Sequence, residues 1–329
     1  MGPINDTLIC WDEGDIAALR AEHRNGLHFV VGDTHGESET LKALMNKIGF
    51  DPEKDHAYFV GDYNAGPNVR QLLSYISEYY RPDFAQPGFH LIRGNHEHEL
   101  GPLFPLENLP DVIVIKGKNI NFHIVHAGMD AKAFSLINAD LAAHPDEPVT
   151  AYKLDECCVC FDAPLRQMTW SMRGLYSQRS HWHVWPSESE LYKNRACIVH
   201  GHSPFCFFVH DNGFSYGEDS VFWEKQHIFF SQSLQSFNLD ANVKGRRQNG
   251  QSYRGLACIC LEVFDSAAAK NFGWLDREAV IAAENGVFGV PLGAGWGTGS
   301  DRIDERLFAS PKMRTITLDA NGKPCIADG

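Results

Sequence analysis

The chain has 329 residues and a mass of 36.9 kDa, and 43% of its residues are hydrophobic, which is enough for a substantial core. This composition excludes a disordered or fibrous protein. Asp and Glu number 42 against 29 Lys and Arg, so the formal charge is −13 and non-specific binding to a nucleic-acid backbone is disfavoured. The 16 histidines are a surplus that points to metal binding or proton transfer.

The cysteines and the N-terminal segment bear on the compartment. Nine cysteines form an odd count without the spacing of a small disulfide-stapled domain, so the cytoplasm is the expected location. The opening segment MGPINDTLICWDEGD carries acidic side chains where a secretory signal has basic ones. No apolar run reaches membrane-spanning length, so we expect no membrane partner.

Apolar runs alternate with helical patterns through the first part of the chain. Apolar residues at helical spacing predict helices over Glu37–Ile48 and Val69–Tyr80. Runs rich in Val, Ile and Phe, each ending in glycine or a polar cluster, predict strands. These strands are Leu27–Val31, His56–Val60, Phe89–Ile92, Asn121–Val125 and Ala196–Val199. The alternation is typical of an α/β sheet protein, in which functional residues gather in the loops at strand ends.

The second part of the chain is predicted to be richer in strands. The predicted strands are Phe205–Val209, His227–Phe230, Phe237–Leu239 and Leu256–Phe264. A helix is predicted over Asp276–Ala283, and Asn321-Gly322 within TITLDANGKPCI predicts a hairpin. We assign residues 1–265 to one main domain with a cap-like insertion at 130–195, and residues 266–329 to a C-terminal extension.

Each of five predicted strands ends on a side chain that can bind a metal. The strand ends read GDTHG, GDYNAGP, RGNHE, HAG and GHSP, and the candidate ligands are Asp33, His35, Asp62, Asn95, His126 and His202. Oxygen and imidazole ligands without thiolate suit Mn, Fe or Zn. Six such ligands fit a site in which two cations share one carboxylate.

In this order the motifs resemble those of the calcineurin-like metallophosphoesterase superfamily, over residues 27–265. Within it, LIRGNHE and the GDY-type second motif resemble the branch that holds phosphoprotein Ser/Thr phosphatases and symmetric diadenosine tetraphosphatases. The resemblance implies an α/β four-layer sandwich, with two mixed β-sheets flanked by helices. It further implies that Asp62 bridges two metals, with Asp33 and His35 on the first and with Asn95, His126 and His202 on the second.

The resemblance also implies roles for groups that act on the substrate. A metal-bridging hydroxide would attack phosphorus, and His96 would be the general acid that protonates the leaving-group oxygen. The second motif departs from the family pattern GDxxDRGP, because GDYNAGP is one residue shorter and lacks both the Asp and the Arg. Asn64 remains as a neutral partner for His96, and Arg173 is the candidate ligand for the substrate phosphate.

Three other features admit two interpretations each. The cluster Cys157, Cys158 and Cys160 suggests zinc or redox chemistry, but the absence of a second cysteine pair favours ordinary packing. The run His181–Trp185 is either an aromatic platform for a base or peptide, or a small local core. The Gly-rich VPLGAGWGTGS lacks the Lys-Ser/Thr that ends a P-loop, so nucleotide binding there is not expected.

We therefore expect an enzyme with two divalent or trivalent metal ions that hydrolyses phosphate monoesters, with protein Ser/Thr phosphatase as the leading activity. Three alternatives stay open: a nucleotide anhydride hydrolase similar to diadenosine tetraphosphatases, a phosphodiesterase, and a non-catalytic scaffold that binds a phosphate ligand. The expected partner is a phosphorylated protein or nucleotide. The sequence does not set the oligomeric state.

Overall fold

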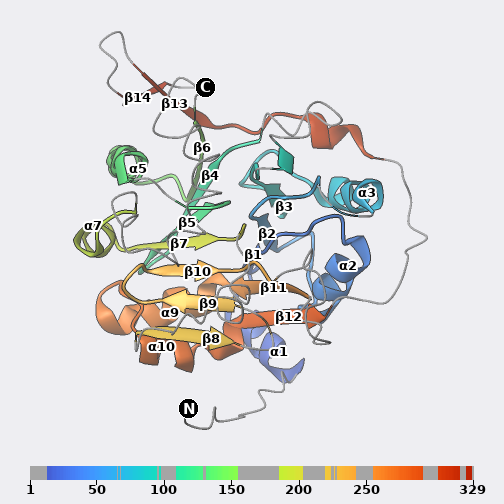
Figure 1. The fold of residues 1–329 in the computed structure, drawn as a ribbon. Helices are drawn as coiled ribbons and strands as arrows, with labels where there is room; N and C mark the ends of the chain where they lie inside the picture. The colour runs from blue at the N-terminus through green and yellow to red at the C-terminus, as the bar shows by residue number, and fades with distance from the viewer. Residues whose placement is uncertain are drawn as a thin grey trace, which may run out of the picture.

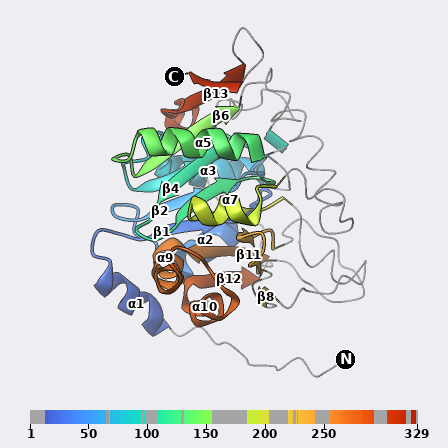
Figure 2. The ribbon, with the colours of Figure 1, turned by 90° about the vertical axis from the view of Figure 1, so that its left-hand side faces the viewer.

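Two mixed β-sheets lie at the centre of the molecule, with helices on both outer sides (Figure 1). Helices α2 (Ser38–Lys47) and α3 (Val69–Tyr79) cover the five-stranded sheet. On the other side α5 (Ala131–Ala143) and α7 (Glu188–Lys193) lie over the nine-stranded sheet (Figure 2). The α/β architecture of two mixed sheets flanked by helices is therefore confirmed.

The computed structural model describes most of both sheets. The described residues are 13–64, 66, 68–94, 96–97, 109–128, 131–154, 185–202, 219–223, 226, 228–241, 255–291, 303–318 and 324–327. Among them, no helix combines the length and the apolar character needed to cross a bilayer.

The five-stranded sheet carries the first three motifs. Its order is β12 (Val287–Pro291), β11 (Gly255–Cys260), β1 (His28–Val31), β2 (His56–Phe59), β3 (Gly88–Leu91). Strands β1, β2 and β3 are parallel, whereas β11 runs antiparallel to β1 and to β12. The three predicted strands at this position are confirmed, each within a residue of its expected start.

The nine-stranded sheet carries the last two motifs. Its order is β14 (Pro324–Ala327), β13 (Arg314–Leu318), β6 (Val149–Leu154), β4 (Val112–Lys116), β5 (Asn121–Val125), β7 (Ala196–His200), β10 (Ser236–Asn238), β9 (Ile228–Ser231), β8 (Ser220–Trp223). Strands β5, β7 and β10 are parallel neighbours. The predicted hairpin is confirmed as the antiparallel pair β13–β14.

The apolar run predicted as one strand over Leu256–Phe264 is split in the structure. Strand β11 ends at Cys260, and helix α9 (Leu261–Ala268) begins directly after it. In α9 the buried residues Leu261, Phe264 and Ala268 recur at helical spacing, so the same apolar letters bury one helix face. The prediction of a strand to Phe264 was wrong because a short apolar run fits either period.

Further elements lie at the ends of the chain. The described helices also include α1 (Glu13–Glu22), α10 (Arg277–Ala282) and the 3-10 turns η3 (Ala269–Asn271), η4 (Glu284–Gly286) and η5 (Glu305–Phe308). The predicted helix at Asp276 is confirmed as α10, and the Asp276 carboxylate caps it by accepting from Ala279 N at 2.6 Å.

Segments assigned to an insertion and to an extension contribute strands to the two sheets. From residues 130–195, β6 joins the nine-stranded sheet between β13 and β4. From residues 266–329, β12 extends one sheet and the hairpin β13–β14 extends the other. Strand β6 is paired on both sides, whereas β12 and β14 are edge strands, and an edge strand carries a weaker local pattern than a buried central one.

Candidate metal centre

Parallel pairing brings the ends of several strands to one edge. Val31 is level with Phe59, and Phe59 with Leu91, so the loops after β1, β2 and β3 leave the sheet together. In the other sheet Ile124 is level with Val199, so the loops after β5 and β7 also coincide. The His126 ring joins the sheets, because its Nδ1 lies 2.7 Å from the carbonyl oxygen of Val60.

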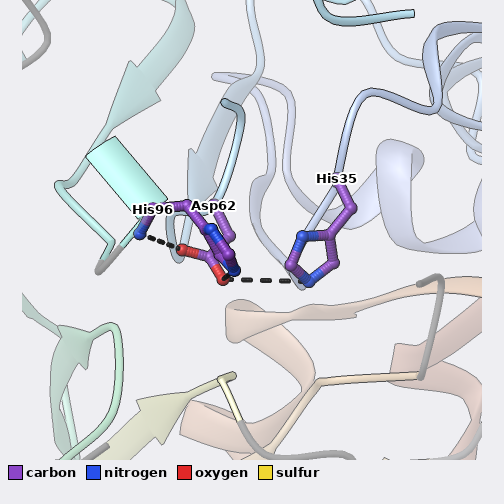
Figure 3. Close-up of side chains that lie close together, drawn as sticks. All are labelled: His35, Asp62 and His96. Carbon is purple, nitrogen blue, oxygen red and sulfur yellow. Dashed lines mark hydrogen bonds and ion pairs between the residues drawn. The ribbon is translucent and has the colours of Figure 1, made fainter. Parts of the chain in front are cut away.

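One group of possible ligands is His35, Asp62 and His96, shown in Figure 3. Their ligand atoms lie within 4.8 Å of one another. His35 Nε2 is 3.8 Å and His96 Nε2 is 3.9 Å from Asp62 Oδ2. These separations exceed hydrogen-bond length, so the three atoms leave room for a cation between them.

A second group is Asp62, His126 and His202. His126 Nε2 lies 3.4 Å from Asp62 Oδ1 and 3.1 Å from His202 Nδ1. Asp62 therefore belongs to both groups, with Oδ2 turned to the first and Oδ1 to the second. Two overlapping groups that share one carboxylate are the arrangement expected where two cations have a common ligand.

Asp33 lies beside the second group. Its Oδ2 accepts the backbone N–H of His202 at 2.5 Å, and its Oδ1 lies 3.5 Å from His126 Nδ1. Oδ1 is buried and accepts no hydrogen bond from any residue that the structure describes. A buried carboxylate oxygen without a hydrogen-bond donor destabilises the folded state unless a proton or a cation is bound to it.

The charges at the site also favour a cation. Burial, with repulsion from Asp240 and then Asp62, raises the pKa of Asp33 well above its usual value. Burial first, and Asp62 next, raises the pKa of Glu97 to about 7. Burial lowers the pKa of His126 to about 4, so this ring is neutral at pH 7, as a metal ligand must be. Bound divalent ions would offset the repulsion among these carboxylates, so the residues fit a metal centre.

Three of the candidate ligands have left-handed backbone conformations. The φ angles are +42° at His35, +59° at Asp62 and +70° at His202. Such conformations cost of order 1–3 kcal/mol each in non-glycine residues and persist only where surrounding contacts enforce them. At His35 one such contact is the backbone N–H, which donates to Asp62 O at 2.9 Å.

Glycines allow the close approach of these loops. Gly61 has a φ of +112°, and a Cβ atom there would lie 2.8 Å from Gly94 Cα. At Gly201 a Cβ atom would lie 2.6 Å from both carboxylate oxygens of Asp33. A side chain at either position would therefore push the ligand loops apart.

Glu97 holds the loop that carries Asp62, a role that the sequence pattern does not predict. Its Oε2 accepts from Asp62 N and Gly94 N, both at 2.8 Å. Its Oε1 accepts from Tyr63 N at 2.7 Å and Asn64 N at 2.9 Å. The signal was present, since Glu97 ends the motif RGNHE, but three of its four backbone partners, Asp62, Tyr63 and Asn64, lie more than thirty residues away in the chain.

Asp240 is a second residue without a predicted role. It follows β10, is 2% exposed, and interacts with the side chain of Asp33. Its own N–H donates to Asn238 Oδ1 at 3.0 Å.

The remaining predicted site residues have different outcomes. Asn95 and Arg173 lie outside the described residues, as do Cys157, Cys158 and Cys160. His96 lies close enough to Asp62 to count among possible ligands, although its predicted role is that of an acid. Trp185, the described end of the aromatic run His181–Trp185, is 5% exposed and packs at 5.8 Å from the His200 ring, so it is a core residue.

A family model described as calcineurin-like phosphoesterase matches residues 29–241. The chain belongs to this family. The match spans every strand end that contributes to the candidate metal centre, so the chain is a hydrolase of the phosphoesterase type.

Curated relatives of this phosphoesterase match over short segments. The symmetrical bis(5'-nucleosyl)-tetraphosphatase of Serratia proteamaculans is 32% identical over 73 residues, which are 22% of this chain and 24% of the relative. The enzyme of the same name from Pseudomonas fluorescens is 43% identical over 49 residues, 15% and 17% of the two chains. The phosphoesterase thus spans about a quarter or less of the length of these two relatives.

Solved structures resemble the phosphoesterase at lower identity. A structure of a proposed diadenosine tetraphosphatase covers 82% of this chain and 96% of its own, at 16% identity and a TM-score of 0.40. A protein serine/threonine phosphatase from Saccharomyces cerevisiae covers 75% and 81% of the two chains, at 14% identity and a TM-score of 0.38.

Proposed function

We propose that this phosphoesterase hydrolyses phosphoric anhydride bonds of nucleoside polyphosphates with two bound metal ions. The observation that carries the metal chemistry is the shared carboxylate of Asp62, which faces His35 and His96 with one oxygen and His126 with the other. The substrate class is supported by the curated relatives, which are named symmetrical bis(5'-nucleosyl)-tetraphosphatases.

The chain's own side chains would share the work as follows. The proposed metal ligands are Asp33, His35, Asp62, Asn95, His126 and His202. The metal ions, when bound, supply positive charge that activates water and offsets the charge on the phosphate oxygens. Mn, Fe and Zn all suit this donor set.

His96 is proposed as the proton donor to the leaving group. Its side chain is 22% exposed, whereas that of His35 is 8% and that of Asp62 3% exposed, so His96 is the most accessible member of its group. Its backbone N–H donates to Asp62 Oδ1 at 3.1 Å, which fixes the residue beside the shared carboxylate. A ring in this position can release a proton toward a substrate that enters from solvent.

Arg173 is proposed as a ligand of the substrate phosphate, since GDYNAGP lacks the arginine of the family's second motif. An Arg173→Lys variant keeps the charge but loses the bidentate geometry. We expect it to raise KM more than it lowers kcat.

The test is a substrate panel with metal-depleted protein reloaded with Mn²⁺, Zn²⁺ or Fe²⁺. The panel contains diadenosine tetraphosphate, p-nitrophenyl phosphate, bis(p-nitrophenyl) phosphate and a phosphoserine peptide. We expect the highest kcat/KM on diadenosine tetraphosphate. Preference for the phosphopeptide would instead support the protein phosphatase predicted from the sequence, and preference for the bis-ester would support a phosphodiesterase.

The Asp62→Asn variant separates the metal chemistry from the substrate class. It retains the side-chain shape but weakens both groups at once, so we expect loss of metal binding in calorimetry and loss of turnover on every substrate. Turnover by Asp62→Asn at the wild-type rate would overturn the metal assignment. If the metal-loaded wild type hydrolysed none of the four substrates, the proposed enzymatic activity would be wrong. That result would support a non-catalytic scaffold that binds a phosphate ligand.

A further inference from the structure

An exposed aromatic side chain projects from the surface next to the end of α7. Phe272 is 85% exposed and has a φ of +56°. The turn around it is held by hydrogen bonds from Gly273 N to Ala268 O at 3.0 Å and from Trp274 N to Asn271 O at 3.1 Å. Its backbone is therefore fixed by hydrogen bonds on the C-terminal side of α9.

A second exposed aromatic lies in the same place. Tyr192, on α7, is 54% exposed, and its ring lies 5.6 Å from that of Trp274. The described residues include three large hydrophobic side chains that are exposed, and Phe272 and Tyr192 are two of them. Trp274, which contacts Tyr192, is two residues from Phe272, so the three aromatic residues form one apolar patch, and contiguous apolar patches on a water-exposed face mark interaction sites.

The same surface also has a hollow, at the beginning of α7. The cavity has a volume of about 460 Å³, and its apolar wall is formed by Ala131, Trp185, Pro186 and Leu234. Glu188, in the first turn of α7, lines it as well. This volume lies in the range of protein pockets that enclose aromatic groups.

The patch and the hollow are parts of one rigid surface. Leu234, in the wall of the hollow, and Trp274, in the patch, pack against the same core cluster. The adjoining residues Gln235 and Leu275 exchange two hydrogen bonds, of 2.7 and 3.1 Å. The spacing between Phe272 and the hollow is therefore fixed by the fold.

Side chains of opposite charge lie at the two ends of α7. Glu188 lies at the hollow, whereas Arg195 follows the other end of the helix and packs against Gly273, next to Phe272. Both side chains are exposed, and neither forms an ion pair with a residue that the structure describes. The surface thus presents an acid beside its hollow and a base beside its projecting aromatic.

We propose that this surface joins two copies of the chain about a two-fold axis. With the two α7 helices antiparallel, the Phe272 ring of each copy enters the hollow of the other, and each Glu188 meets the partner's Arg195. A two-fold interface requires a surface that is complementary to itself. This surface meets the requirement, because the projecting Phe272 ring with Arg195 lies at one end and the hollow with Glu188 lies at the other. Binding of a different protein would account for the exposed Phe272 ring but not for a matching hollow on the same surface.

The primary test is the mass of the intact protein by sedimentation equilibrium over a range of concentrations. We expect the wild type to be a dimer and Phe272→Asp to weaken dimerisation at least tenfold. Phe272 is exposed in the single chain, so this variant should keep the circular dichroism spectrum of the folded protein. The control is Ile281→Asp, which changes another exposed apolar residue, 39% exposed, outside the patch and should remain dimeric.

A charge exchange tests the antiparallel arrangement itself. Glu188→Arg and Arg195→Glu should each weaken dimerisation, because each places like charges together across the axis. The double variant should restore it, since both contacts regain opposite charges. A monomeric wild type, a dimeric Phe272→Asp or a double variant weaker than both single variants would each overturn the proposal. The readout is mass, so the result is independent of the activity proposed above.

Discussion

Replacing Glu97 with Gln should damage the metal centre through the backbone. The Glu97 carboxylate accepts four backbone N–H groups, two on each oxygen. An amide can satisfy one pair but presents its own N–H₂ to the other, so two buried donors lose their acceptor. At about 1–3 kcal/mol for each unsatisfied donor, the loss is about 2–6 kcal/mol. Removal of a negative charge next to Asp62 offsets part of this loss, so the expected decrease in the free energy of unfolding is about 2–4 kcal/mol.

The variant should also lose metal affinity. One pair of donors belongs to Asp62 and to Gly94, the residue that precedes Asn95, and the other pair to the two residues after Asp62, so the loss of either pair disturbs the loop that carries the shared carboxylate. Outer contacts that orient metal ligands are typically worth 10–100-fold in affinity, and we expect a loss in that range. Urea denaturation would give the stability, and calorimetric titration of metal-depleted protein with Mn²⁺ would give the affinity.

Asp265 provides a matched control. Its Oδ1 accepts the backbone N–H groups of Asn119 at 2.8 Å and Ile120 at 3.0 Å, so it also holds a loop by a carboxylate. That loop lies before β5, whereas the proposed ligand His126 follows the other end of the strand. Asp265→Asn should therefore lower stability without a change in metal affinity. If Glu97→Gln and Asp265→Asn left metal affinity equally intact, Glu97 would be a structural residue only.

Three further predictions concern the site and the histidines outside it. Asn64→Asp restores the carboxylate of the family pattern, which stabilises an imidazolium, so the alkaline limb of its kcat profile should move to higher pH; an unchanged profile would mean that residue 64 does not contact the acid. Chelation of bound metal should lower the melting temperature measured by calorimetry, because carboxylates at the site then repel one another, and re-addition of Mn²⁺ should restore it. Burial lowers the pKa of His90 to about 3, so below pH 6.5 the unfolded chain binds a proton that the folded chain does not; this group costs about 1.4 kcal/mol of stability per pH unit between about 6.5 and 3. His90→Phe should reduce the slope of stability against pH by that amount between pH 6 and 4, and an equal slope would refute the assignment.

The strands that carry the site were predictable because each combines a buried apolar run with an abrupt polar end. β1 and β5 illustrate this, since Asp33 lies two residues after β1 and His126 directly follows β5. Strands β4 and β6 were not predicted, and β6 pairs with a segment near the C-terminus that no local pattern could reveal. The division between β11 and α9 was also missed, because local periodicity does not show that Glu262 turns back to accept from His28 N at 3.0 Å.

The role of Glu97 illustrates what a sequence pattern leaves out. Spacing in the chain indicated which side chains follow strand ends, and the structure brings most of the described ones together around Asp62. The spacing could not indicate that the Glu97 carboxylate accepts backbone N–H groups from the preceding motif, since that contact depends on the geometry of the turn. Residues that hold a loop through its backbone impose no chemical pattern on the partner residues, so they are harder to predict than ligands.

Three histidines outside the candidate metal centre also show what the sequence alone does not indicate. His28, His56 and His90 lie on adjacent strands β1, β2 and β3, yet none belongs to a candidate ligand group among the described residues, because each lies within its strand rather than after it. His28 stacks on His56 at 4.6 Å, and His56 Nδ1 lies 3.0 Å from His90 Nε2. His90 Nδ1 faces the Arg81 carbonyl oxygen at 3.1 Å and must donate to it, so its Nε2 accepts from His56. A second proton on His90 would place two donors against each other. The position of a histidine relative to its strand end therefore decides whether the imidazole can take up a metal or must remain a neutral part of the core.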